Sequence, residues 1–184
     1  MADTNPNPNR IADASWRYIQ ARLAMDPGDT VYAGSHVDKP GYHGTRAENQ
    51  ARDRVTGRTD YSVRLPADLL GPSDKTAGYD FKSLSAASGD YTRMAQRGAL
   101  VLAAFEARDP RLRGWREWLG QTDGDRAAEG LDFVTWTRRT PDPTHEWHDH
   151  ESELRAYVES WTNKLCLLSI LSTETLAAYL ARGG

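Results

Sequence analysis

The sequence predicts an α+β fold, in which a small antiparallel sheet is covered by packed helices. Three observations lead to this expectation. Apolar residues recur at helical spacing near both ends and in the middle of the 184-residue chain. Short segments rich in β-branched and aromatic residues lie between these helical segments. Residues 28–90 are rich in glycine and proline and contain only short candidate strands, which is typical of functional loops.

Helices are expected over residues 11–25, 90–108 and 151–171. The second is the clearest, because Asp90 is placed to cap it and an apolar stripe follows, made of Met94, Val101, Leu102 and Phe105. The third has a comparable stripe, made of Leu154, Val158, Trp161, Leu165 and Leu168. A short helix is expected after Pro110, with one apolar side made of Leu112, Trp115, Trp118 and Leu119. A last short helix is expected to start at Ser172 or Thr173 and to end at Gly183.

Strands are expected at Asp60–Leu65, Tyr79–Phe81 and Phe133–Arg139. We expect three parts in one compact chain. Residues 1–10 form an extended N-terminal arm, since Pro6 and Pro8 disfavour helix. Residues 11–150 form the α+β domain, and residues 151–184 form a C-terminal helical extension that packs on the same domain or docks a partner.

Composition excludes several classes of protein. The net charge of −3 gives no reason to expect nucleic-acid binding, and no apolar run approaches the roughly 18 residues of a membrane span. Cys166 is the only cysteine, so no intrachain disulfide forms, and its apolar surroundings indicate an inert thiol. The polar N-terminus has no features of a signal peptide. Phosphate-binding loops, dinucleotide fingerprints and serine-hydrolase elbows are also absent from the sequence.

The segment from Asp142 to His150 concentrates metal-binding groups. It contains three of the five histidines and three carboxylates, and imidazole together with carboxylate suits zinc or a similar divalent ion. If the segment is extended, one face presents Glu146, His148, His150 and Ser152. The alternative interpretation is a polar surface strand or a structural histidine cluster. His43, in a predicted turn, is interpreted as a structural residue bonded to a loop carbonyl or as a site residue.

Three segments occur in an order known from one enzyme family. They are Gly41-Tyr42-His43 through Arg46 and Asn49, then Asp60-Tyr61-Ser62 through Asp80-Phe81, and finally Trp147-His148. In these segments the chain resembles zinc-dependent peptidoglycan peptidases of the D-alanyl-D-alanine carboxypeptidase type, including phage endolysins that cleave L-alanyl-D-glutamate. It is most similar to a divergent branch from phages of actinobacteria. The resemblance spans roughly residues 40–150 and implies the carboxypeptidase/hedgehog-like form of the α+β fold.

The resemblance implies a zinc site and a general base, with two departures from the family pattern. Asp80 and His148 fall on family zinc ligands, but the zinc histidine falls on Ser73, so Asp74 or His150 is expected to replace it. The general base falls on His145, where the family has glutamate. The neighbouring Glu146 and Asp142 are alternative catalytic residues.

The resemblance implies a metal-dependent hydrolase that cuts the peptide stem of peptidoglycan, as an endolysin or a virion-associated enzyme. Two alternatives stay open: a non-catalytic virion or tail protein that binds cell wall or other tail proteins, and an unrelated metal-binding protein. The expected cofactor is zinc. The expected partners are peptidoglycan stems and other virion proteins. Without a signal peptide, the protein is expected to be made in the host cytoplasm and to act at the cell wall or in a virion.

Overall fold

The computed structural model describes residues 7–182. Its α+β fold is built on one six-stranded sheet that is antiparallel throughout, with the order β1-β2-β6-β3-β4-β5. This confirms the predicted fold class. The strands are β1 (Thr30–Gly34), β2 (Gly78–Ser83), β3 (Trp115–Gly120), β4 (Glu129–Asp132), β5 (Thr137–Arg139) and β6 (His148–Glu153).

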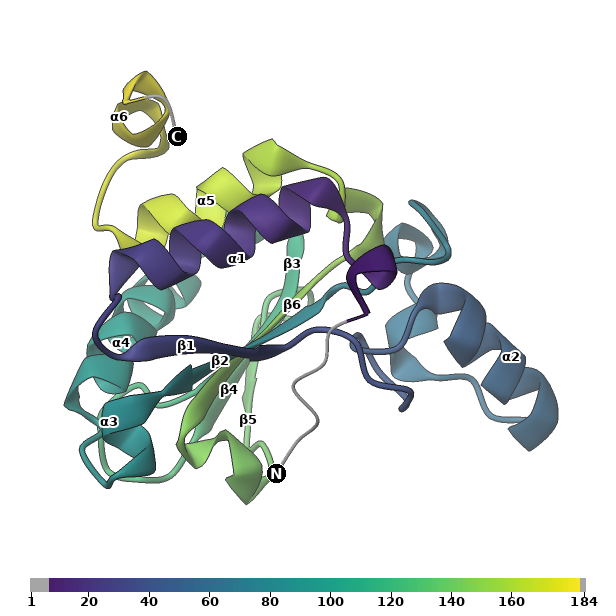
Figure 1. The fold of residues 1–184 in the computed structure, drawn as a ribbon, viewed down its shortest axis with the longest axis horizontal. Coiled ribbons are helices and arrows are strands. Elements are labelled where there is room, and N and C mark those ends of the chain that lie inside the picture. Colours follow the sequence, from purple (N-terminus) through teal and green to yellow (C-terminus); the bar gives the residue numbers. More distant parts are fainter. Residues whose placement is uncertain (1–6, 183–184) are drawn as a thin grey trace.

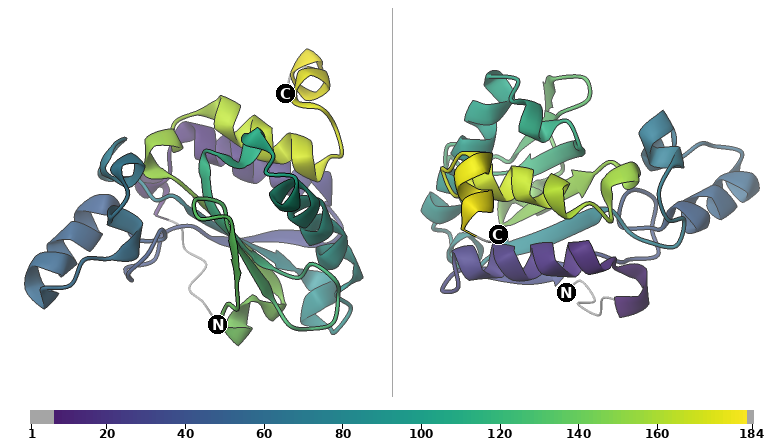
Figure 2. Two further views of the ribbon diagram at one scale, coloured as in Figure 1. Left: turned by 180° about the vertical axis from the view of Figure 1, so that it is seen from behind. Right: turned by 90° about the horizontal axis from the view of Figure 1, so that it is seen from above.

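Helices α1 and α5 lie side by side over one face of the sheet (Figures 1 and 2). Helix α2 lies at the other end of the molecule from α3 and α4 (Figure 1). The helices are α1 (Asp13–Met25), α2 (Arg46–Thr56), α3 (Leu84–Ala87), α4 (Thr92–Glu106), α5 (Trp161–Leu171) and α6 (Leu176–Ala181). Over residues 7–182, none of the helices combines the length and apolar character needed to cross a bilayer.

The main core fills the space between the sheet and these helices. Tyr18 of α1 is fully buried, and its ring lies 5.3 Å from the rings of both Tyr79 on β2 and Trp115 on β3. Trp118 and Leu168 belong to the same cluster. Burial of such side chains stabilises the fold by about 1.5–3 kcal/mol each. The core therefore holds β2, β3 and α1 in fixed relative positions, and these elements position the site described below.

Two predicted helices occur where expected, at α1 and α4, and the C-terminal one begins later than predicted. The segment from Glu151 to Glu153 is not helical, because it continues β6 and pairs with both β2 and β3. Helix α5 starts only at Trp161. The preceding Ser160 caps it, because its hydroxyl accepts a hydrogen bond from the Asn163 amide. Interstrand hydrogen bonds on both sides here outweigh the helical spacing of the apolar residues.

Other local expectations were also wrong. The predicted short helix from Leu112 to Leu119 is a 3-10 turn (Pro110–Leu112) followed by β3, since its aromatic residues also fit a buried strand. The predicted strand Asp60–Leu65 is a 3-10 turn, in which the Asp60 carboxylate accepts a hydrogen bond from the Ser62 amide. The predicted strand Phe133–Arg139 is confirmed only at Thr137–Arg139, which form β5, whereas residues 133–136 form the hairpin turn from β4, with Trp136 in the left-handed region at a φ of 53°. Strand β1 and helix α2 were not predicted.

The predictions for the two ends of the chain are tested only in part. Residues 1–6 of the predicted arm lie outside the described residues, and the rest of it forms a 3-10 turn at Pro8–Arg10. The last helix starts at Leu176 rather than at Ser172 or Thr173, because Thr175 supplies the capping hydroxyl. Gly183, the predicted end of this helix, also lies outside the described part of the chain.

Candidate metal centre

Strand β6 is fully buried although it contains no apolar residue. Because strand side chains alternate, His148, His150 and Ser152 face one side of the sheet. The other side carries Asp149, Glu151 and Glu153, which face helices α1 and α5. A central strand of this composition is stable only if both faces satisfy their polar groups.

On the helical face, arginine and lysine side chains pair with the buried carboxylates. Arg22 of α1 contacts Glu151 at 3.1 Å and Asp149 at 3.4 Å, and Lys164 of α5 contacts Glu153 at 2.7 Å. Burial raises the pKa values of Asp149 and Glu151, and Arg22 opposes this rise. Removing one partner of such a pair leaves an uncompensated buried charge. These pairs therefore fix the position of β6 and of its histidines.

The opposite face of β6 borders a cavity of about 930 Å³. Asp80 on β2 lies directly across from His150 in the strand register. The turn before α2 brings His43 to the same place. The cavity is lined by residues that include Lys39, Tyr42, His43, Tyr61, Asp80, Lys82, Glu117, Arg139, Asp142, His145, Trp147, His148 and His150.

Three potential ligand atoms converge at the floor of this cavity. His43 Nε2 lies 3.1 Å from Asp80 Oδ1 and 3.0 Å from His150 Nδ1, and the last two atoms are 2.8 Å apart. A point about 2 Å from all three atoms exists above a triangle of this size, which is the usual length of a zinc bond to nitrogen or oxygen. Both histidines are almost fully buried.

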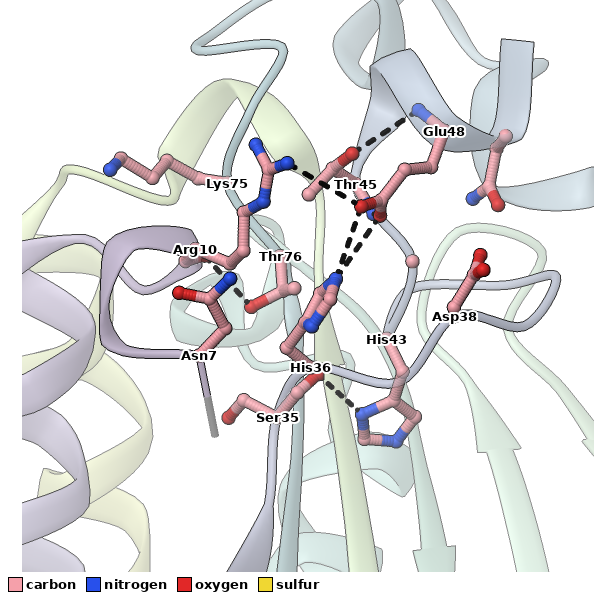
Figure 3. A network of polar contacts seen from close by, with 12 residues as sticks. Asn7, Arg10, Ser35, His36, Asp38, His43, Thr45, Glu48, Lys75 and Thr76 are labelled. Atoms are coloured by element: carbon pink, nitrogen blue, oxygen red, sulfur yellow. Dashed lines mark hydrogen bonds and ion pairs between the residues drawn. The ribbon is translucent and has the colours of Figure 1, made fainter. Parts of the chain in front are cut away.

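Hydrogen bonds behind the two imidazoles set their tautomers. His43 Nδ1 lies 2.8 Å from the Ser35 carbonyl, which only accepts, so the N–H is on Nδ1 and Nε2 carries a lone pair (Figure 3). His150 Nε2 lies 2.7 Å from Ser152 Oγ, which in turn donates to Glu117 Oε1 at 3.3 Å. Since the serine hydroxyl donates to glutamate, it accepts from His150, and Nδ1 carries the lone pair.

The three converging atoms are therefore all acceptors, and such an arrangement requires a cation or a proton between them. When a proton takes that place, burial still opposes ionisation of Asp80, but the charge on His43 and the hydrogen bond from His150 outweigh it and hold the pKa of this carboxyl well below its ordinary value. Metal-binding histidines typically donate their other N–H to a carbonyl or a carboxylate-linked group, as both do here. The buried group of His43, Asp80 and His150 could thus hold a metal ion.

The turn that carries His43 is held by buried polar contacts. The guanidinium of Arg155 donates to the carbonyls of Gly41 and Gly44, at 3.2 and 2.9 Å. Asn49 of α2 donates to the Gly41 carbonyl at 2.7 Å. Gly44 has no space for a side chain, since a Cβ would lie 2.6 Å from the Lys39 carbonyl oxygen.

Two further histidines stand beside the cluster. His148 Nε2 lies 3.9 Å from Asp80 Oδ1, and the ring of His145 lies 4.8 Å from that of His148 and 5.7 Å from that of His150. Burial lowers the pKa of His148 to about 4 and also lowers that of His145. Both imidazoles are neutral at pH 7 and can accept a proton or bind a metal. Asp142 holds His145, through its carbonyl at 3.2 Å and its carboxylate at 3.5 Å.

Other residues singled out in the sequence lie elsewhere. Asp74 is exposed and pairs with Lys75 at 3.5 Å. Glu146 does not share the face of His148, because Asp142 caps a 3-10 turn (Pro143–Glu146) before β6 begins. The Glu146 carboxylate instead lies 3.2 Å from Arg126. His36, the remaining histidine, contacts Glu48 at 3.2 Å (Figure 3).

Sequence counting thus did not select His43 as a ligand. Counting from Asp80 reached Ser73, which is exposed, whereas the turn before α2 supplies the third potential ligand atom from more than thirty residues away. The available signal was His43 itself, in the first of the three segments that carry the family resemblance. Comparisons with protein-family models, with curated proteins and with solved structures find no match for this chain.

Proposed function

We propose that this protein is a zinc-dependent hydrolase of the peptide stem of peptidoglycan, with the carboxypeptidase/hedgehog-like form of the α+β fold. It would act as a phage endolysin or as a virion-associated enzyme. The observation that carries the proposal is the convergence of three acceptor atoms, from His43, Asp80 and His150, at the floor of a large cavity. Two imidazoles and one carboxylate match the ligands of catalytic zinc sites, which keep a further position open for water.

The chemistry follows from the residues around the cluster. His43, Asp80 and His150 would hold the zinc, with His148 next to them as a further donor. Zinc, when bound, supplies a water of lowered pKa and polarises the scissile carbonyl. His145 accepts the proton of the attacking water and passes it to the leaving amine, since its lowered pKa keeps it in the basic form. Asp142 orients the His145 ring for this transfer.

The size of the cavity supports a peptide substrate. About 930 Å³ is at the upper end of the range for ligand pockets, and several residues of a peptide fit within it. Tyr61 and Arg139 line this space with Glu117, which accepts a hydrogen bond from Tyr61 at 3.4 Å and pairs with Arg139. Polar and aromatic walls of this kind suit a peptide stem with both carboxylates and methyl groups.

The first test is the zinc content of the purified protein by inductively coupled plasma mass spectrometry. We expect about one zinc per wild-type chain and loss of zinc in an Asp80→Asn/His150→Ala double variant. Asp74→Ala is the matched control and retains the metal, because this carboxylate is at the surface. Mass spectrometry of digested peptidoglycan then identifies the bond that is cut. A wild-type chain that binds no zinc from zinc-supplemented buffer would contradict the proposal.

One observation favours a second candidate, a virion or tail protein that binds cell wall without cutting it. The glutamate of the histidine segment, Glu146, pairs with Arg126 rather than facing the cluster. A base of this type is the usual partner of zinc in peptidases. Zinc-loaded protein that sediments with purified peptidoglycan and releases no peptide from it would support this candidate over the hydrolase.

A further inference from the structure

Lys82 lies close to the candidate metal centre on the same strand. It follows Asp80 by two residues on β2, so the two side chains share the cavity face at a spacing of about 6.6 Å along the strand. In the register with β6, Lys82 is opposite His148, just as Asp80 is opposite His150. The strand pairing therefore fixes the backbone of Lys82 next to the cluster, and its side chain lines the same cavity.

The ammonium group of Lys82 is held by an aromatic ring and lacks an anionic partner. Its Nζ lies 5.3 Å from the centre of the Trp147 ring. Across residues 7–182 the lysine takes part in no ion pair or side-chain hydrogen bond. Arg139, another cation of the cavity, differs because Glu117 neutralises it. Lys82 is thus a partly buried positive charge that faces the cavity and lacks a partner.

Lys82 and Trp147 also border a second hollow. This hollow, of about 500 Å³, is lined by both residues together with Ser88, Tyr91 and Arg126. The two hollows therefore share Lys82 and Trp147 as lining residues.

We propose that Lys82, supported by Trp147, is a subsite for a carboxylate of the substrate, in the same cavity as the bond that is cut. This inference rests on the proposed function and deepens it, because the Lys82 subsite would select acidic peptides over neutral ones. An ammonium group pairs with a carboxylate as a point charge, and the aromatic ring positions it. Two carboxylates of a peptide stem offer this chemistry: the C-terminus and the free carboxyl of its glutamate.

Lys39 provides the matched comparison. It lines the same cavity and also has no ion pair among the described residues, but it lies exposed on a loop and no aromatic ring supports it. Removing its charge changes the net charge of the cavity by the same amount. A Lys39→Met variant therefore separates a specific subsite from a general electrostatic attraction.

The experiment uses the zinc-loaded protein and three synthetic stem pentapeptides. One has both carboxylates free, one has a C-terminal amide, and one has its glutamate carboxyl amidated. Isothermal titration calorimetry gives Kd for each peptide, and mass spectrometry of the products gives kcat and KM. For the free acid, Lys82→Met is expected to raise Kd and KM about tenfold to a hundredfold, with kcat within about twofold of wild type.

The pattern over the three peptides identifies the carboxylate. The peptide amidated at the recognised position binds wild type weakly, and Lys82→Met does not weaken it further. Lys82→Arg restores most of the affinity for the free acid, and Lys39→Met changes it by about twofold at most. Equal losses on all three peptides, or a loss confined to kcat, would overturn the subsite.

Failure of the subsite and failure of the hydrolase give different results. Wild-type protein that binds the free acid through Lys82 but cuts no peptide retains the subsite and contradicts the hydrolase. Protein that cuts the stem with the same preference in wild type and Lys82→Met retains the hydrolase and contradicts the subsite. If none of the three peptides binds, both proposals are contradicted.

Discussion

His43 Nε2 and His150 Nδ1 lie 3.0 Å apart although 107 residues separate the two histidines in the chain. One belongs to a turn before α2 and the other to the central strand β6. Asp80 Oδ1, from β2, completes the triangle at 3.1 and 2.8 Å. Three acceptors held this close repel one another unless a cation or proton is present. We therefore expect the site to bind a metal and the residues that hold these three side chains to affect the metal affinity.

Ser152 is expected to tune the metal affinity without being a ligand. Its hydroxyl accepts a hydrogen bond from His150 Nε2 and donates one to Glu117. These two hydrogen bonds fix the His150 tautomer in which the Nδ1 lone pair faces the cluster. Ser152→Ala should weaken zinc binding about tenfold or more, as is usual for contacts behind metal-binding histidines. Competition with a fluorescent zinc chelator measures the affinity. Ser88→Ala, which removes an exposed hydroxyl, is the control, and an unchanged zinc affinity in Ser152→Ala would contradict the assignment.

Arg155 is expected to position His43. It is almost fully buried and donates to the carbonyls of Gly41 and Gly44, on either side of the histidine. Arg155→Met leaves the Gly44 carbonyl without this donor, whereas the Gly41 carbonyl keeps its hydrogen bond from Asn49. An unsatisfied buried group costs about 1–3 kcal/mol. We expect lower stability in urea and a weaker zinc affinity.

A conservative variant separates the two effects of Arg155. Arg155→Lys keeps a charge but cannot reach both carbonyls in the way a guanidinium does. Zinc affinity is measured below the unfolding midpoint of each variant, where the protein is folded. If folded Arg155→Lys and Arg155→Met bind zinc as tightly as wild type, the residue supports only the fold.

His145 is expected to be the general base of the proposed hydrolysis. His145→Ala should lower kcat by about 10²- to 10⁴-fold with its zinc content unchanged. Asp142→Asn should give a smaller loss, since the His145 ring also contacts the Asp142 carbonyl at 3.2 Å. Glu146→Gln is the informative comparison, because this carboxylate pairs with Arg126. A loss of activity in Glu146→Gln as large as that in His145→Ala would assign the base to Glu146.

Asp29 is expected to contribute stability that depends on pH. Burial opposes its ionisation, but hydrogen bonds from the Ser83 hydroxyl and the Ser85 amide, at 2.5 and 2.6 Å, outweigh it and lower the pKa of this carboxyl. A lowered pKa means that the contribution is complete above the ordinary value of 3.8 and disappears as the pH falls through the lower value of the folded state.

The check is the stability difference between wild type and Asp29→Asn. Urea unfolding at pH 7 should show a loss of about 1–3 kcal/mol in the variant. Below the folded-state pKa of Asp29, the free energies of unfolding of wild type and variant should become similar. Both proteins lose any bound metal at low pH. The effect of this loss cancels, because wild type and variant are compared at the same pH. A difference that stays constant from pH 7 to the acid end would contradict the assigned role of Asp29.

Helices α1 and α4 could be predicted from local pattern. The stripes of α1 and α4 have helical spacing over three turns or more, and tertiary contacts agree with this preference. The local pattern gave the wrong secondary structure where a short aromatic run fits both a helix and a strand. Trp115 and Trp118 suit one face of a helix, yet they lie on β3, where pairing with β4 and β6 satisfies the backbone. A local pattern does not contain the partner strand, so it cannot decide between the two.

The sequence by itself determined the α+β class and the wealth of metal-binding groups in residues 142–150. These follow from residue type, periodicity and density along the chain, whereas Asp80 was expected as a ligand only through the family resemblance. Only the tertiary structure decided which ligands meet. It selected His43 over Asp74, turned Glu146 toward Arg126 and placed Lys82 beside the cluster. The physical reason is that ligand geometry depends on distances in space, and strand pairing and buried ion pairs set these distances between residues far apart in the chain.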